Sequence, residues 1–564
     1  MSLPLERPWL AHYPEGVRPQ LEYPDQPLHH LLDETAARMP HAPAILFYGR
    51  RLTWHEVRRA ADAFAVALQE LGVRPGDRVA IMMPNVPQGV IAYWGTLKAG
   101  ALVVFFNPLY VEREIEHQLK DSGAEIMVVL DLLYEKVRAV MDRTHLRKVI
   151  VTPIRAYMGL ALKLLVPLVK RELVARVPAE PHVLSLQSLL RQYDGRAPAP
   201  LAVNPATDVA VLQYTGGTTG LSKGAMLTHR NLVANVHQVR EWMPGLVDGG
   251  ERMLAVMPFF HVYGLTCCLH LGTLIGATLL LVPKFDLKQV LGLIDKEKPT
   301  LFPGAPPIYV AINHCKDLAR YNLRSVKACI SGAAALPVEV QRQFEQLTGG
   351  KLVEGYGLTE ASPVTHCTPV YGRRVPGSIG LPLPDTEMMV VDLETGTTPV
   401  APGEQGELCI RGPQVMAGYW NRPEEMARTV RDGWLHTGDI VTVDKAGYTF
   451  VVDRIKDLII ASGYNIVPRE VEEVLYEHPA VMDAVVVGVP DEYRGQTVKA
   501  YIVLKPGESL TADDLIAYCR ERLARFKVPT LVEFRGSLPK TMIGKVLRRV
   551  LLEEEQQRLG APGP

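Results

Sequence analysis

The sequence predicts an α/β protein in which a large N-terminal domain precedes a small α+β domain. Its 564 residues exceed the length of one ordinary domain. Apolar strand-like runs alternate with amphipathic helix-like runs from about residue 27 to residue 354, which is typical of parallel sheets with helices on their faces. From about Gly377, short strands separated by glycine and proline turns indicate an antiparallel β unit.

The first elements in chain order are two buried strands, at 78–83 and 125–130, with an amphipathic run ending near Ala99 between them. The alternation resumes after Asp208, and further strands are expected at 209–214, 253–257, 277–282, 325–330 and 351–353. Several of these strands lead into loops of glycine or small residues. Because ligands bind beyond the carboxyl ends of strands in open α/β sheets, these loops are the first candidates for a site.

The later elements are shorter and change in character. In the antiparallel unit, strands are expected at 388–392, 406–411 and 447–452. In the last hundred or so residues, helices are expected at 468–478 and 512–523, and strands at 484–489 and 497–504. A boundary within 453–457 divides the chain into a large domain, 1–454, and a C-terminal α+β domain, 455–564.

Composition excludes some functions. Lys plus Arg and Asp plus Glu each total 61, and a chain without net charge is a poor candidate for nucleic-acid binding. The seven cysteines form no CxxC pair, so buried reduced thiols are expected. Residues 1–16 lack the apolar core of a secretory signal, and we expect a cytoplasmic protein. The sequence leaves the oligomeric state open, a homodimer included.

Two apolar stretches bear on membrane contact. Residues 259–282 carry no Lys, Arg, Asp or Glu, but their histidines and glycines favour a buried helix to about Ile275, a turn at Gly276 and a buried strand. Residues 154–176 mix leucines with basic residues. This second stretch has two interpretations: peripheral contact with an anionic inner membrane surface, or an ordinary surface helix or loop.

The clearest chemical signal is a loop after the strand expected at 209–214. Its glycines allow close approach to a polyphosphate, its threonines add donors, and a lysine adds positive charge. The lysine is preceded by Ser and followed by Gly, so this is not a Walker A loop. The loop residues are Tyr214, Thr215, Gly216, Gly217, Thr218, Thr219, Gly220, Leu221, Ser222, Lys223 and Gly224.

This loop resembles the nucleotide loop of the adenylate-forming superfamily, with Ser222 where many members carry Pro. Two further loops resemble family motifs, namely Ser331-Gly332-Ala333-Ala334-Ala335 and Tyr356-Gly357-Leu358-Thr359-Glu360. The resemblance extends from about residue 27 to residue 552 and is closest to bacterial long-chain fatty-acid–CoA ligases. It implies two doubly wound α/β subdomains and a small β-barrel-like subdomain, followed by a mobile C-terminal domain.

The resemblance also implies roles for these residues. The loop at Gly332, Ala333 and Ala334 would lie along the adenine, and Tyr356, followed by Gly357, would stack on it. Thr359 would contact the α-phosphate. Glu360 and Thr215 would hold Mg²⁺, a hard cation that prefers oxygen ligands. His261, which elsewhere would be an ordinary core histidine, matches a family histidine near the substrate carboxylate.

The block 432–456 resembles the signature of fatty acyl-CoA synthetases. By this resemblance, Asp439 accepts hydrogen bonds from both ribose hydroxyls, Arg454 contacts the same ribose, and Lys456 is the hinge residue. Ile455 stands where close relatives often have Lys. Lys545 matches the adenylation lysine. A loop facing the site during thioester formation matches Ser462, Gly463, Tyr464 and Asn465.

The resemblance therefore implies an enzyme that uses ATP, Mg²⁺ and coenzyme A to convert medium- or long-chain fatty acids to acyl-AMP and then to acyl-CoA. Lys545, Lys223, His261 and Thr359 would be catalytic. Three alternatives stay open at this point. They are an acyl-AMP ligase that serves a carrier protein, a ligase for aryl acids, and a binder of nucleotide or lipid without activity.

Overall fold

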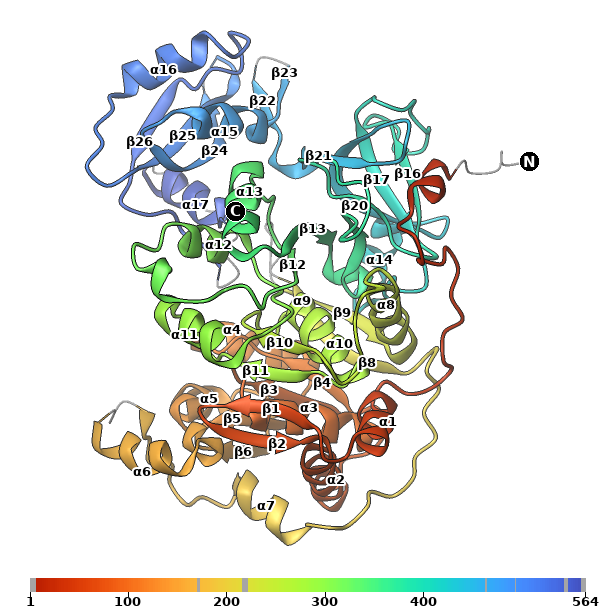
Figure 1. Ribbon diagram of the computed structural model, residues 1–564. Coiled ribbons are helices and arrows are strands. Elements are labelled where there is room, and N and C mark those ends of the chain that lie inside the picture. The colour runs from red at the N-terminus through yellow and green to blue at the C-terminus, as the bar shows by residue number, and fades with distance from the viewer. Residues whose placement is uncertain are drawn as a thin grey trace.

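A computed structural model describes residues 7–169, 173–215, 222–461, 464–491, 493–541 and 546–558. The larger body contains two sheets with helices around them, an antiparallel sheet lies beside it, and the C-terminal region forms a separate layer (Figure 1). A mixed α/β architecture with a large N-terminal part and a small C-terminal part confirms the predicted fold class.

The first sheet has eight strands in the order β18-β9-β8-β4-β3-β5-β6-β7. Its strands from β8 to β7 are parallel, whereas β9 and β18 run antiparallel to their neighbours. The bounds are β3 Arg78–Met82, β4 Leu102–Phe105, β5 Ile126–Leu130, β6 Lys148–Thr152, β7 Val183–Ser185, β8 Val209–Thr215, β9 Lys223–Thr228 and β18 Gly418–Tyr419.

Alternating side chains of these strands enter two different cores. Val79 and Ile81 of β3 belong to the main core, whereas Ala80 and Met82 belong to a second core on the opposite face. Both faces are therefore covered, as a doubly wound sheet requires. The main core receives α2 Trp54–Glu70, α3 Pro87–Lys98 and α7 Leu186–Gln192, and the second receives α4 Glu112–Ser122 and α5 Tyr134–Met141.

The second sheet consists of two four-stranded parts, β10-β11-β1-β2 and β12-β13-β14-β15. Leu301 joins them through bridges to Met253 and Ala328. The bounds are β1 Pro43–Phe47, β2 Arg50–Thr53, β10 Arg252–Ala255, β11 Thr278–Leu281, β12 Ala328–Ser331, β13 Lys351–Gly357, β14 Val364–Cys367 and β15 Leu381–Pro382. The strand expected at 325–330 starts later because residues 323–326 form a turn, closed by Val326 N–H donating to the Leu323 carbonyl.

Helices of the second sheet also lie on both faces. The main core lies between the two sheets and includes residues of α1 His30–Arg38, α8 His229–Glu241 and the π-helical turn η5 Leu265–His270. A third core holds residues of α11 Leu287–Glu297, α12 Pro306–Asn313 and α13 Val338–Thr348. The shorter turns of this body are η2 Asp131–Leu133, η3 Ile154–Tyr157, η6 Leu318–Arg320 and η7 Thr359–Ala361, whereas η1 Pro8–His12 lies beside the antiparallel sheet (Figure 1).

The apolar stretch 259–282 is a buried helix, a turn and a buried strand, as predicted. Helical turns α9 Val262–Gly264, η5 and α10 Leu271–Leu274 lead through Gly276, at a φ of +65°, into β11. The described helices include none long and apolar enough to cross a bilayer. The stretch 154–176 contributes η3 and α6 Leu160–Val169, which projects at the lower left of the molecule (Figure 1).

The antiparallel unit has five strands, β16 Glu387–Val391, β17 Gly406–Arg411, β20 Trp434–Val443, β19 Val430–Arg431 and β21 Thr449–Arg454, with α14 Pro423–Thr429. After η8 Ile455–Asp457, a second five-stranded sheet contains β22 Ile459–Ala461, β23 Tyr464–Ile466, β24 Val481–Asp491, β25 Gly495–Leu504 and β26 Leu531–Phe534. Helices α15 Pro468–Glu477, α16 Ala512–Arg520 and α17 Arg548–Arg558 accompany it. The division at 454 and 455 stays a prediction.

Candidate functional site

The predicted phosphate loop connects two antiparallel strands. Thr215, the last residue of β8, pairs with Lys223, the first residue of β9, so the loop leaves and re-enters the sheet at one point. The loop residues Gly216, Gly217, Thr218, Thr219 and Gly220 lie outside the described residues. The Tyr214 phenol points into the second core, where it donates a 2.6 Å hydrogen bond to Asp121, so Tyr214 presents its backbone to the loop.

A polar cluster joins this hairpin to the second motif. Lys223 Nζ forms an ion pair with Glu425 and lies 5.7 Å from the centroid of the Tyr419 ring. The Tyr419 hydroxyl in turn donates a 2.6 Å hydrogen bond to Glu360 Oε1. The fold therefore gathers Lys223 and Glu360, which are 137 residues apart in the chain, around one tyrosine.

Three predicted residues meet beside the antiparallel sheet. The Tyr356 hydroxyl donates a 2.5 Å hydrogen bond to Asp439 Oδ2, and Arg454 Nε lies 2.8 Å from Asp439 Oδ1. Asp439 is only 2 % exposed, and burying a carboxylate is costly unless it is paired in this way. The arrangement places a buried acceptor beside an aromatic ring, a combination suited to a nucleoside.

The loop after β12 lies next to this group because β12 and β13 are parallel and end at the same edge. Ala333 adopts a φ of +70°, a left-handed conformation that costs a non-glycine residue about 1–2 kcal/mol. Gly332 packs on the Tyr263 ring, since a Cβ there would lie 3.2 Å from it. The Tyr263 hydroxyl donates to the Ile330 carbonyl at 2.7 Å, which holds the strand end that leads to Ala334.

Two strands pack very closely at Gly357, in the second motif. A Cβ at this position would lie 2.0 Å from the Pro363 carbonyl oxygen, so only glycine fits. Thr359 and Glu360 follow in the short turn η7, and the Glu360 carbonyl accepts a 2.8 Å hydrogen bond from Met416 N–H. The close packing at Gly357 therefore sets the direction in which the Thr359 and Glu360 side chains leave the strand.

His261 is half-buried at the start of α9. Its Nδ1 accepts a 3.3 Å hydrogen bond from Tyr263 N–H, the geometry of a helix cap. The segment from His261 to Tyr263 therefore has two structural roles. His261 caps the helical turn, and Tyr263 supports the loop at Gly332. The catalytic role expected for His261 stays a prediction.

The C-terminal region reaches this body on one side. Lys456 is exposed in η8. Arg469 of α15 contacts the last strand of the antiparallel unit, because its Nη1 donates to the Val451 carbonyl at 2.7 Å and its N–H to Asp453 Oδ2 at 2.9 Å. The backbone at Tyr464 and Asn465 begins β23. Ser462, Gly463 and Lys545 lie outside the described residues.

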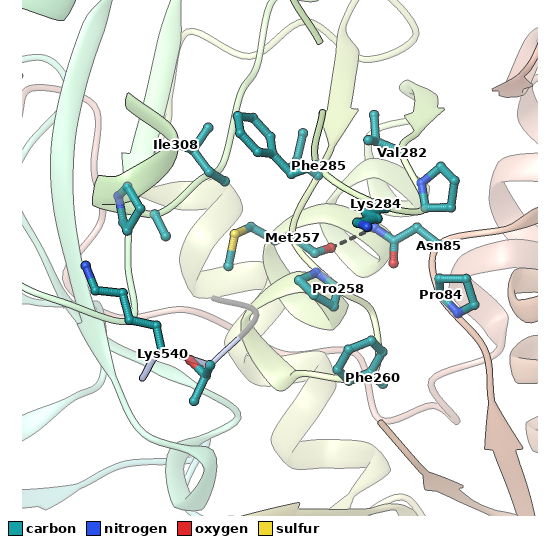
Figure 2. A pocket seen from close by; sticks show the side chains of 15 residues that line it. Pro84, Asn85, Met257, Pro258, Phe260, Val282, Lys284, Phe285, Ile308 and Lys540 are labelled. Atoms are coloured by element: carbon teal, nitrogen blue, oxygen red, sulfur yellow. Dashed lines mark hydrogen bonds between the residues drawn. The ribbon is translucent and has the colours of Figure 1, made fainter. Parts of the chain in front are cut away.

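A cavity of about 260 Å³ lies where the C-terminal region meets the large body (Figure 2). Its walls come from the segments that follow β3, β10 and β11, from the start of α12, and from Lys540 and Thr541. The lining is mainly apolar, with Met257, Phe260, Phe285 and Ile308 among the side chains that surround it. Lys540 forms an ion pair with Asp483 of β24.

Comparison with known proteins agrees with this geometry. The profile described as "AMP-binding enzyme" matches residues 32–420, and that described as "AMP-binding enzyme C-terminal domain" matches residues 470–545. The chain belongs to the AMP-binding enzyme family. The first match ends at Trp420 and the second begins at Glu470, so neither includes Asp439 or Arg454.

The sequence similarity between this AMP-binding enzyme and known proteins extends over almost the whole chain. A long-chain-fatty-acid–CoA ligase of Bacillus subtilis (strain 168) is 48 % identical over 98 % of this chain and 99 % of that protein. A protein of the same name from Escherichia coli O157:H7 is 39 % identical over 98 % of this chain and 99 % of its own length. The crystal structure of the anthranilate CoA ligase AuaEII in complex with anthranoyl-AMP superposes with a TM-score of 0.83 at 27 % identity, covering 95 % of this chain and 98 % of that one.

The site of this AMP-binding enzyme contains three residues that sequence reasoning missed. Tyr419 and Glu425 follow the phosphate loop by about two hundred residues, and no spacing connects them to it. Glu354 lies two residues before Tyr356 and therefore on the same face of β13. Burial raises the pKa of its carboxyl to about 7, against the lowering effect of Arg469. An acidic residue inside an apolar strand is the signal that could have identified Glu354.

Proposed function

We propose that this AMP-binding enzyme converts long-chain fatty acids, ATP and coenzyme A into acyl-CoA, AMP and pyrophosphate through an acyl-adenylate. The observation that carries the proposal is the buried Asp439 carboxylate held between Tyr356 and Arg454. Such a group can accept hydrogen bonds from the two ribose hydroxyls, with the Tyr356 ring available to the adenine. The relative of 48 % identity supports a fatty-acid substrate.

In the first step, a fatty-acid oxygen attacks the α-phosphorus of ATP and pyrophosphate leaves. Negative charge accumulates on the phosphates, so catalysis depends on positioning and on positive charge. Lys223 supplies such charge at the hairpin, with Lys545 assigned the same task by its motif. Because Lys223 and Glu425 are each about one-third exposed, their ion pair is weak, and a phosphate can replace Glu425 at little cost.

Thr359 and the backbone of the phosphate loop complete the phosphate contacts in this proposal, and His261 faces the acid. The hydroxyl of Thr215 and the carboxylate of Glu360 are hard oxygen donors that fit Mg²⁺. When bound, Mg²⁺ would neutralise phosphate charge. The Tyr419 hydroxyl, which donates to Glu360 Oε1, leaves the other carboxylate oxygen to act as the ligand.

In the second step, the coenzyme A thiol attacks the acyl carbonyl and AMP leaves. Lys545 and the loop Ser462, Gly463, Tyr464 and Asn465 are assigned to different steps at one site. We therefore include a rotation of the C-terminal domain about Lys456 in the proposal. The position of Lys456 supports this, because it lies exposed in the short turn η8 between the antiparallel unit and the C-terminal sheet, and hinges are a few residues at the ends of such elements.

The proposal is tested by palmitate-dependent ATP–pyrophosphate exchange and by mass-spectrometric detection of palmitoyl-CoA. Activity should rise along a series of saturated acids and be low with benzoate. Exchange with palmitate but without palmitoyl-CoA would identify an acyl-AMP ligase. Activity confined to benzoate would indicate an aryl-acid ligase, and background exchange with every acid would refute the proposal.

We also propose that α6 touches an anionic membrane surface. Leu160, Leu162 and Leu165 are 76, 40 and 52 % exposed, far more than apolar side chains of a packed helix, and Lys163 is exposed among them. Exposed leucines beside basic residues fit a lipid surface that provides both apolar chains and negative charge. A homodimer stays a prediction.

Co-sedimentation with phosphatidylglycerol vesicles tests this contact, with phosphatidylcholine vesicles alongside. The double variant Leu160→Ser/Leu165→Ser should lose most binding. Leu393→Ser is the matched control, because Leu393 is 43 % exposed in the antiparallel unit. Equal binding of all three proteins would remove α6 from the proposal and leave the catalytic part intact.

A further inference from the structure

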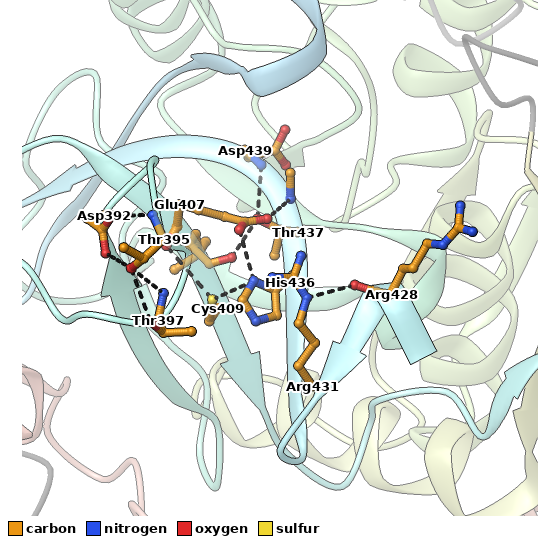
Figure 3. A network of polar contacts seen from close by, with 12 residues as sticks. Asp392, Thr395, Thr397, Glu407, Cys409, Arg428, Arg431, His436, Thr437 and Asp439 are labelled. Carbon is orange, nitrogen blue, oxygen red and sulfur yellow. Dashed lines mark hydrogen bonds and ion pairs between the residues drawn. The ribbon is translucent and has the colours of Figure 1, made fainter. Parts of the chain in front are cut away.

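The carboxylate proposed to bind the ribose stands on an irregular part of β20. Glu407 of β17 pairs with Ile440, and Cys409 pairs with His436, so one residue of β17 faces three residues of β20. These three, Thr437, Gly438 and Asp439, form a bulge, and Figure 3 shows Asp439 at its far end. Bulges redirect side chains next to active sites, and here the bulge sets the direction of Asp439.

The bulge interrupts the ladder, so its backbone groups need other partners. Glu407 Oε1 accepts a 3.0 Å hydrogen bond from Gly438 N–H. The Thr437 hydroxyl donates to the Leu408 carbonyl at 2.8 Å and accepts from Asp439 N–H at 3.1 Å. Two side chains therefore replace the missing ladder bonds on both sides of Gly438, which has a φ of +71°.

His436 fixes the other end of the Glu407 carboxyl group. Its Nδ1 lies 2.8 Å from Glu407 Oε2, and the Cys409 sulfur lies 3.4 Å from the same nitrogen (Figure 3). The His436 and Glu407 side chains are only 7 and 10 % exposed. With both oxygens engaged in a packed site, Glu407 has little freedom to turn away from Gly438.

The ligand atoms of Glu407, Cys409 and His436 lie within 4.8 Å of one another, close enough for a metal ion. Hydrogen bonds already account for both Glu407 oxygens and for His436 Nδ1, the atoms that such an ion would use. A metal bound by Glu407 Oε2 and His436 Nδ1 would have to break the hydrogen bond between these two atoms. The cluster is therefore better explained as a support for the bulge.

We propose that Glu407, held by His436, is a positioning residue that orients Asp439 for the ribose of ATP. Glu407 acts through the backbone of Gly438 and does not touch the nucleotide. This inference rests on the proposed ribose contact of Asp439. It adds that the contact depends on a glutamate of a neighbouring strand, 32 residues earlier in the chain.

The test compares ATP with 2′-deoxy-ATP in palmitate-dependent pyrophosphate exchange. The readout is the ratio of kcat/KM for the two nucleotides, which does not change if a variant merely loses part of its folded fraction. In the unmodified enzyme, the ratio should be at least about tenfold, since one hydrogen bond to a charged group is lost. Glu407→Ala should lower it at least about threefold, and Glu407→Gln, which keeps an acceptor for Gly438 N–H, should restore much of it.

Thr437→Val provides a second route if Glu407→Ala does not fold, because it removes the other support of the bulge with little change in shape; it too should lower the ratio. Glu387→Gln is the matched control, a carboxylate of the same sheet that pairs with Arg411, and its ratio should stay unchanged. If Asp439→Asn lowers the ratio but Glu407→Ala and Thr437→Val leave it unchanged, the positioning role of Glu407 is overturned. The ribose contact of Asp439 would then still stand. A ratio of one in the unmodified enzyme that Asp439→Asn does not alter would instead refute the ribose contact, and this inference with it.

Discussion

Arg454 Nε lies 2.8 Å from Oδ1 of Asp439, and the two residues face each other in register across β20 and β21. The sheet itself therefore brings the positive and negative groups together. Asp439 is almost fully buried, and this partner and the Tyr356 hydroxyl offset the cost of burying its carboxylate. This relationship makes Asp439 the most informative position for mutation.

Asp439→Asn should lower kcat/KM for ATP about tenfold to a hundredfold, because the amide is a weaker acceptor and leaves Arg454 without its charge partner. KM for palmitate should change little. Steady-state pyrophosphate exchange measures both parameters. Asp248→Asn, a change to an exposed carboxylate that pairs with Arg38 and Arg240, is the control and should behave like the unmodified enzyme.

Lys223→Met should lower kcat/KM for adenylation about a hundredfold or more, as expected when a charge that stabilises the transition state is removed. Its effect on the unfolding midpoint should be small, because the ion pair with Glu425 is partly exposed. Pyrophosphate-exchange kinetics measure the change in kcat/KM, and urea unfolding measures the change in the unfolding midpoint. The control is Lys327→Met, which breaks a pair with Glu251 outside the site. A large loss of stability without a loss of rate would contradict the proposed role.

Because of Glu354, the free energy of unfolding should decrease as pH rises through about 7. The pKa of its carboxyl is near its usual value in the unfolded chain but is raised to about 7 in the folded protein, so folding favours the protonated form. The stabilisation from the protonated Glu354 carboxyl is complete below a pH of about 4.5. It is lost as the pH rises to about 7 and above. Urea unfolding between pH 5 and 8 should show a decrease that Glu354→Gln reduces by about 1–2 kcal/mol.

The control for this pH effect is Glu339→Gln. Glu339 is exposed, and hydrogen bonds from Arg342 and Gln343 lower the pKa of its carboxyl to about 2, outside the tested range. The pH profile of this variant should therefore match that of the unmodified enzyme between pH 5 and 8. If Glu354→Gln kept the full pH dependence, another group would be responsible.

Lys456→Pro should slow palmitoyl-CoA formation at least about tenfold and leave pyrophosphate exchange within about twofold, because proline fixes φ and restricts rotation at the hinge. Single-turnover assays of the two steps measure the difference. Lys456→Ala removes the side chain and leaves φ free, so it should retain both activities. Equal slowing of the two steps by Lys456→Pro would exclude a selective hinge at this residue.

Much of the fold could be predicted from local patterns. Strands β3, β5 and β17 lie within one residue of their expected bounds, because continuous apolar runs between turn signals leave few alternatives. The strand expected at 325–330 begins later in the structure, where β12 spans Ala328–Ser331. Val326, the second residue of this segment, closes a turn with Leu323, and such local competition is not visible in hydropathy.

The sequence by itself determined the fold class, the order of the elements and the residue types of a nucleotide site, because periodicity and loop composition act over short distances along the chain. Only the tertiary structure decided that Tyr419 joins Lys223 to Glu360, that the Tyr214 phenol turns away to Asp121, and that Glu407 supports the bulge before Asp439. These contacts connect residues from about thirty to two hundred positions apart. Sheet register and core packing bring such residues together, and neither leaves a regular spacing in the sequence.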